Sequence, residues 1–221
     1  MRSEARTRDR ILRAALKWFA RKGYAGTSIR DVVTTARVSR PVLYYYFGSK
    51  AGLYQALVNW AADERLRLMR EAVGRGPSLE AQLRELAVTM FEFARGHREL
   101  MRLAFATAVA AREEVPDEAK CLEKGFESLA FLEELMRRGQ QTGVITRRFD
   151  AESLAIGFAG LMHLYVLLHV VKPDVPLDRA VANTVVDVFL KGAASTPDEN
   201  NPAEKSKDPK STAKKGGKDC G

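Results

Sequence analysis

Apolar residues recur at helical spacing through most of the chain, and turn signals divide that pattern into segments. One face of the first segment is formed by Ile11, Ala15, Leu16, Phe19 and Ala20. Gly23 is expected to end this helix, because glycine is favoured where a chain leaves a helix. The pattern therefore predicts a first helix that is followed by a turn.

A second, short helix is predicted directly after this turn. Thr27 or Ser28 can cap it, and Asp31 is placed to return a capping-box hydrogen bond to Ser28. Its apolar face is short, so we expect the helix to end at about Ala36.

A third helix is predicted after a short break. Ser39 is expected to cap it, and Pro41 falls in its first turn, where a missing N–H group costs nothing. Leu43 and Phe47 are one helical turn apart and are expected to point inward.

Longer helices are predicted for the rest of the chain. Ser49 can cap a fourth helix over 50 to about 73, and Ser78 can cap a fifth after the Gly- and Pro-containing break at 74–77. Further helices are expected at about 97–112, 117–141, 150–172 and 178–193. No segment shows the alternation of a half-buried strand, so the predicted fold class is all-α.

The composition changes at residue 195. From there on the residues are almost entirely polar, small or Pro, and they cannot bury enough apolar surface to offset the loss of conformational entropy. The predicted organisation is an N-terminal domain over 1–50, a helical body over 51–194 and a disordered polar tail over 195–221.

The charge is concentrated in the first fifty residues. They hold twelve Lys and Arg against three Asp and Glu, a net +9, whereas the whole chain has a net charge of +8. Such a field suits the phosphates of a nucleic acid, although it could also serve an anionic membrane surface or a solvated face.

The N-terminus lacks the continuous apolar stretch of a signal peptide, so we expect a cytoplasmic protein. Cys121 and Cys220 lie far apart, which supports neither a disulfide framework nor a zinc site. No metal and no cofactor are expected.

The second and third helices, joined by a tight turn within the basic segment, form a helix-turn-helix arrangement. The start of the third helix would then face bases, with Arg40 placed to bind guanine and Pro41 or Val42 to contact a thymine methyl. The adjacent Tyr44 and Tyr45 could place their hydroxyls on phosphates. The simpler alternative for the tyrosine run is one core residue and two surface residues.

The stretches 27–31, 36–47 and 49–50 together resemble the N-terminal signature of TetR/AcrR-type repressors. The resemblance implies base-proximal positions at Arg30, Arg40, Pro41, Val42 and Tyr44. It implies phosphate-facing positions at Thr27, Tyr45, Tyr46 and Lys50. Ser28 and Ser39, the two helix caps, complete the predicted DNA-binding set. Arg37 departs from the family, because a glycine is common there, and it would be strained if the turn needs a positive φ.

The resemblance also implies a homodimer, in which the last two helices of each copy form a four-helix bundle. Leu154 to Val171 holds eighteen residues without one charge, a length at which a membrane span must be considered. Two glycines and two histidines interrupt it, so burial at a dimer interface is the favoured interpretation and no membrane partner is expected. Val181, Val185, Val188 and Phe189 give the following helix a second apolar stripe.

The middle helices are rich in Met and Phe, which make adaptable apolar cavities suited to a hydrophobic effector. The candidate ligand-binding residues are Met90, Phe91, Met101, Phe105, Phe126, Phe131 and His163. Simple core packing is the alternative for each. His97 is a further polar candidate, and either histidine could instead be hydrogen-bonded structure.

Catalysis is not expected, because the sequence shows no nucleophile–base pairing, metal-ligand spacing or phosphate-binding glycine loop. The predicted function is a ligand-responsive transcriptional regulator of the repressor type, which binds a palindromic operator in double-stranded DNA as a homodimer and is released by a small apolar effector. The alternative is a nucleoid-type or anionic-surface protein that binds by charge alone.

Overall fold

The computed structural model describes residues 2–109 and 118–191, and all regular structure in these ranges is helical. This confirms the predicted all-α class. In chain order the helices are α1 (Arg2–Gly26), α2 (Ile29–Ala36), α3 (Arg40–Phe47), α4 (Lys50–Arg75), α5 (Leu79–Gly96), α6 (Arg98–Val109), α7 (Glu118–Gln141), α8 (Ala151–Val171) and α9 (Arg179–Lys191). The predicted polar tail lies outside the described residues.

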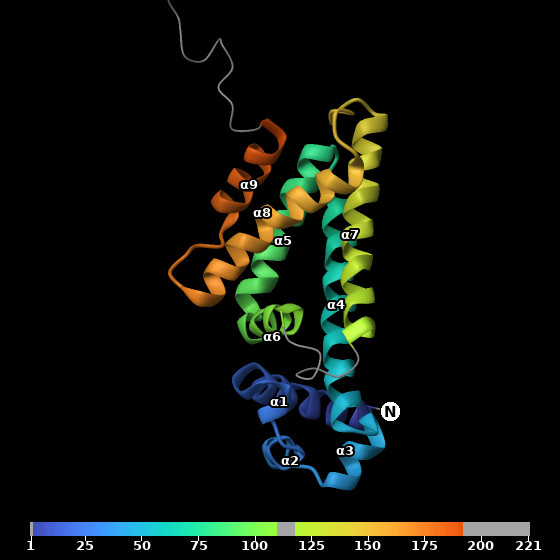
Figure 1. The fold of residues 1–221 in the computed structure, drawn as a ribbon, viewed down its shortest axis with the longest axis vertical. Helices are drawn as coiled ribbons and strands as arrows, with labels where there is room; N and C mark the ends of the chain where they lie inside the picture. The colour runs from blue at the N-terminus through green and yellow to red at the C-terminus, as the bar shows by residue number, and fades with distance from the viewer. Residues whose placement is uncertain (1, 110–117, 192–221) are drawn as a thin grey trace, which may run out of the picture.

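The helices α1, α2 and α3 form a small head at one end of the molecule, and α4 runs from this head into a larger body (Figure 1). The head has its own core, centred on Ile11, Phe19, Leu43 and Phe47. This core continues into the first turns of α4 and also includes Leu103 of α6.

The first helix does not end where the sequence predicts. Gly23 has a non-helical backbone, with φ +69° and ψ 178°, and the helix continues beyond it for only three residues, to Gly26. The break is therefore a kink inside α1. The Gly23 carbonyl remains in use, because the Thr27 hydroxyl donates a 2.7 Å hydrogen bond to it.

The body is built on a second apolar core, to which α4, α5, α7, α8 and α9 all contribute. Helix α5 packs between α4 and α9, and α7 packs against α4 and α8. Helix α6 lies between the two parts, with contacts to α1 on the head side and to α8 on the body side (Figure 1).

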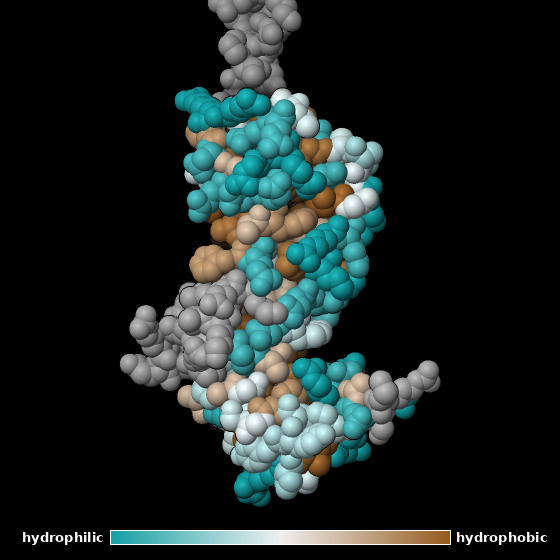
Figure 2. Space-filling view, turned by 90° about the vertical axis from the view of Figure 1, so that its right-hand side faces the viewer, coloured by the Kyte–Doolittle hydropathy of each residue, from teal (hydrophilic) through white to brown (hydrophobic). Residues whose placement is uncertain are grey.

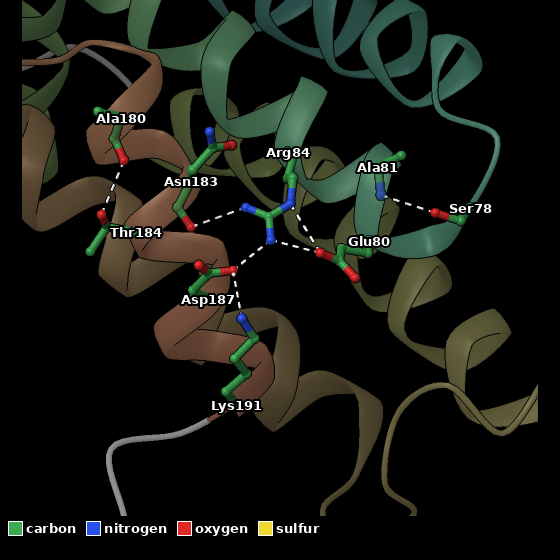
Figure 3. Close-up of polar contacts among 9 residues, drawn as sticks. All are labelled: Ser78, Glu80, Ala81, Arg84, Ala180, Asn183, Thr184, Asp187 and Lys191. Carbon is green, nitrogen blue, oxygen red and sulfur yellow. Dashed lines mark hydrogen bonds and ion pairs between the residues drawn. The ribbon is translucent and has the colours of Figure 1, made fainter. Parts of the chain in front are cut away.

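Arg84 of α5 is the centre of a polar cluster that joins α5 to α9 (Figure 3). Its guanidinium pairs with Glu80 on its own helix at 2.6 Å and with Asp187 on α9. A further hydrogen bond, 3.4 Å long, runs to the carbonyl of Asn183 on α9. These contacts fix the last described helix against the middle of the body.

Helix α8 is long and apolar enough to span a membrane by length and composition, the one such helix in the described ranges. Only 33% of its most apolar window is buried. The exposed apolar side chains include Ile156, Leu164, Leu167, Leu168 and Val171, with Val188 on α9. Figure 2 shows apolar residues at the surface across the middle of the body, with more polar surface above and below.

Candidate nucleic-acid interface

Helix α2 begins with the predicted capping box. The backbone N–H of Asp31 donates to the hydroxyl of Ser28 at 3.1 Å, and the N–H of Ser28 donates back to the Asp31 carboxylate at 3.3 Å. Hydrogen bonding to Ser28 holds the pKa of Asp31 below its usual range, and the positive charge of Lys22 lowers it further. The carboxylate therefore stays ionised and fixes the start of the helix.

The turn between α2 and α3 is formed by Arg37 in the left-handed region, with φ 52° and ψ 51°. Its own N–H and that of Val38 bond back to carbonyls of the last turn of α2, at 3.3 Å and 3.1 Å. The turn thus needs the positive φ that a glycine would adopt without strain. Arg37 itself is exposed.

Helix α3 presents one face to solvent and one to the head core. Leu43 and Phe47 are buried as predicted, and Val42 and Tyr46 are partly buried against the same core. The solvent face is formed by Arg40, Pro41, Tyr44 and Tyr45. The two outer tyrosines are 46% and 79% exposed, so the run holds one inner and two outer residues.

Ser39 stands at the N-cap position of α3, but its side chain makes no capping hydrogen bond. It is exposed, as is Arg30 on the neighbouring helix α2. The start of α3 therefore leaves its first N–H groups without a side-chain acceptor from Ser39, beside an exposed guanidinium at Arg40.

Lys50 and Thr27 both make contacts within the head. The Lys50 ammonium lies 4.4 Å from the centre of the Tyr24 ring and donates a 3.3 Å hydrogen bond to the Ala25 carbonyl. Burial lowers the pKa of Lys50. Thr27 is 2% exposed, and its hydroxyl bonds to α1. Their role at phosphates stays a prediction.

The candidate ligand-binding residues fall in different environments. Phe91 is fully buried, and Met90, Met101, Phe105 and Phe131 pack partly buried against the body core. Phe126 is 60% exposed, on the outer side of α7. The predicted ligand-binding residues therefore do not all lie at one site.

The two histidine candidates differ. His97 follows α5, where its ring stacks on Phe93 with centroids 4.5 Å apart and bonds to the Phe93 carbonyl, as expected for a structural residue. His163 on α8 meets the edge of the Phe105 ring, with centroids 6.4 Å apart. It keeps solvent access, yet burial lowers its pKa, with a further contribution from Arg65.

Sequence reasoning missed Arg65 of α4 and Ser128 of α7, which form a polar contact between these helices at 3.2 Å. A signal for Arg65 existed in the spacing. It interrupts an otherwise apolar helical stripe formed by Val58, Ala62, Met69 and Ala72. A charge at such a position is directed inward with its neighbours.

Comparison with family models matches both parts of the chain. A model described as "Bacterial regulatory proteins, tetR family" matches residues 11–57, and one described as "Tetracyclin repressor-like, C-terminal domain" matches residues 80–170. The first ends near the point where α4 leaves the head core.

Curated relatives are similar mainly over part of their length. The transcriptional repressor NicS of Pseudomonas putida is 33% identical over 104 residues, which are 44% of this chain and 46% of that protein. The probable transcriptional regulator YttP of Bacillus subtilis is 30% identical over 45% of this chain and 49% of its own. The chain thus matches about half the length of these relatives. The repressor SCO4008 of Streptomyces coelicolor is 29% identical over 67% of this chain and 72% of its own.

Solved structures share the fold over nearly all of their length. The regulator FadR of Bacillus subtilis, solved in complex with stearoyl-CoA, superposes with a TM-score of 0.73 at 20% identity, over 84% of this chain and 99% of that one. FadR of Bacillus halodurans gives 0.77 at 20% identity, over 84% and 95%. At this identity the likeness is one of fold.

Proposed function

The chain belongs to the TetR family of bacterial regulatory proteins, and from that premise we propose that it is a cytoplasmic, ligand-responsive transcriptional repressor. It binds a palindromic DNA operator as a homodimer and is released by a small effector. The observation that supports DNA binding most directly is the solvent face of α3, where Arg40, Pro41 and Tyr44 stand exposed in a head with a net charge of +9 over residues 1–50.

The homodimer is supported by the unburied apolar face of α8. Ile156, Leu164, Leu167 and Val171 recur along one side of the helix, and each is more than a third exposed in a single copy. A second copy that packs its own α8 and α9 on this face would bury it, and such a contact sets the distance between the two α3 helices. A palindrome with fixed half-site spacing is the matching DNA site.

The proposed effector response uses α6 as well as α4. Phe105 of α6 contacts His163 of α8, while Leu103 belongs to the head core. The Thr107 hydroxyl of α6 hydrogen-bonds to that of Tyr54, which is buried at the head end of α4. An effector in the body that displaces α6 would therefore act on α4 and on the spacing of the recognition helices.

The second candidate function is a protein that binds DNA or another anionic surface by charge alone. Genomic footprinting at several salt concentrations distinguishes the two. Sequence-specific protection of a palindrome is expected for the repressor, and its loss with an added effector supports the proposed response. Binding without sequence preference, uniformly lost with salt, supports the alternative and contradicts the proposal.

A further inference from the structure

A half-buried arginine of the body, Arg65, has no carboxylate partner among the side chains that the structure describes. Arg65 of α4 donates one hydrogen bond, from Nε to the hydroxyl of Ser128 on α7, at 3.2 Å. Ser128 is itself 6% exposed. Other arginines of the body, such as Arg67 and Arg84, each pair with two carboxylates. Arg65 differs from them because its partner is a hydroxyl group.

Partial burial removes some of the water around the Arg65 charge. Burial lowers the pKa of Arg65, but a guanidinium remains protonated at neutral pH, so its charge must be stabilised by other means. The contact with Ser128 uses Nε and holds the plane of the group. Its two terminal nitrogens remain for a partner that presents two oxygens side by side.

The groups around Arg65 suit a ligand with an apolar part. Burial lowers the pKa of the His163 imidazole on α8, and the positive charge of Arg65 lowers it further. The neutral ring can donate or accept one hydrogen bond. Phe105 of α6 lies edge-on to the same ring and packs, with Met101, against the body core. The helices that carry these residues are neighbours in the body, where α7 packs against α4 and α8, and α6 packs against α8 (Figure 1).

We propose that Arg65 binds the anionic head group of the effector, which is an organic acid with an apolar body. Ser128 orients the guanidinium, and Phe105 and His163 lie beside the bound molecule. The inference rests on the proposed effector response and narrows it from an apolar ligand to an amphipathic anion. The competing explanation is that Arg65 only ties α4 to α7.

Isothermal titration calorimetry with a series of probes that share one chain tests the charge preference directly. The probes are decanoate, decyl phosphate, decanol and decyltrimethylammonium. We expect at least one anion to bind the wild-type protein about tenfold or more tightly than decanol, the size expected for a charge-assisted hydrogen bond. If decanoate binds more tightly than decyl phosphate, the effector has a carboxylate head group; the reverse order indicates a phosphate head group. Equal affinity for anion and alcohol, tighter binding of the cation, or no binding of any probe overturns the proposal.

Variants then assign the preference to a residue. Arg65→Met is expected to remove the advantage of the anion while decanol affinity stays within about twofold, and Arg65→Lys is expected to keep part of it. Arg70→Met is the matched control, because it removes the same charge from an exposed position on the same helix and should change neither affinity. An anion preference that survives in Arg65→Met, with the helical circular dichroism intact, leaves Arg65 a purely structural residue.

Operator binding by the ligand-free protein, measured in parallel, separates this inference from the proposed function. Specific operator binding without an anion preference contradicts the assignment of Arg65 alone. If the protein prefers the anion but shows no sequence-specific DNA binding, the repressor function is contradicted and the anion site is retained.

Discussion

Arg37 shows how one residue can hold a turn in a conformation that its own type disfavours. Its φ of 52° is the one positive value outside glycine among the described residues. The left-handed region brings Cβ close to the following carbonyl oxygen, which destabilises any residue other than glycine. The turn is retained because the hydrogen bonds of Arg37 and Val38 to the end of α2 require it.

Replacing Arg37 by glycine is therefore expected to raise the free energy of unfolding by about 0.5–1 kcal/mol, measured by chemical denaturation. Arg37→Ala is the control, because it removes the same charge and keeps Cβ, and no gain is expected from it. An equal gain from alanine would show that the charge, not the backbone, is the source of the strain.

Arg40 is the exposed residue at the start of α3 that is expected to contact a base. Arg40→Ala should weaken binding to the operator by ~1–3 kcal/mol and relax the preference at one base position. Fluorescence anisotropy with the operator and with random duplexes measures both effects. The same loss on both DNAs would make Arg40 a phosphate contact.

The helices themselves were predictable from local signals. The capping box at Ser28 and Asp31, the proline in the first turn of α3 and the serine caps at 49 and 78 act within one turn, so they are visible in the sequence. Ends without a strong cap were less predictable. Gly23 interrupts the helix at the predicted position, but three more residues, up to Gly26, belong to the helix after this break.

The junction of α3 and α4 depends on a close approach that only glycine allows. A Cβ on Gly52 would stand 2.1 Å from the carbonyl oxygen of Phe47, the last residue of α3. Gly52→Ala is expected to lower the free energy of unfolding by about 1–3 kcal/mol and to weaken operator binding, since α3 must move. Denaturation curves and anisotropy titrations measure the two effects.

Gly74→Ala is the matched control for Gly52→Ala. Gly74 lies on the same helix as Gly52, but a Cβ added at Gly74 would meet no atom within 4 Å. Gly74→Ala should therefore raise the free energy of unfolding by about 0.5–1 kcal/mol. Similar losses at both positions would mean that helix α4 as a whole, rather than the contact with Phe47, is sensitive.

For the whole molecule, the exposed apolar face of α8 predicts the assembly state. Leu164→Arg places a charge in the middle of that face and is expected to convert a dimer into monomers in sedimentation velocity. It should also abolish high-affinity binding to a palindrome, because half-sites are then bound singly. Val144→Arg adds the same charge at an equally exposed position outside α8 and should leave the dimer intact. A Leu164→Arg protein that stays dimeric contradicts the proposed interface.

Tertiary structure decided what local patterns could not. Leu103 lies in α6 but belongs to the head core, and the contact of Arg65 with Ser128 joins residues that are 63 positions apart in the chain. Lys50, expected at phosphate, lies over Tyr24 in the head because α4 begins against α1. Such contacts join distant segments, so no spacing within one helix reveals them.

The sequence alone determined the all-α class, the helix-turn-helix head and the concentration of positive charge in its first fifty residues. These follow from side-chain periodicity, capping and composition, which act over one or two helical turns. The tertiary structure decided which residues of α3 remain exposed, where α6 joins head and body, and that Arg65 meets Ser128 rather than a carboxylate. Each of these depends on how helices far apart in the chain pack, and packing is set by the fit of whole faces rather than by any local pattern.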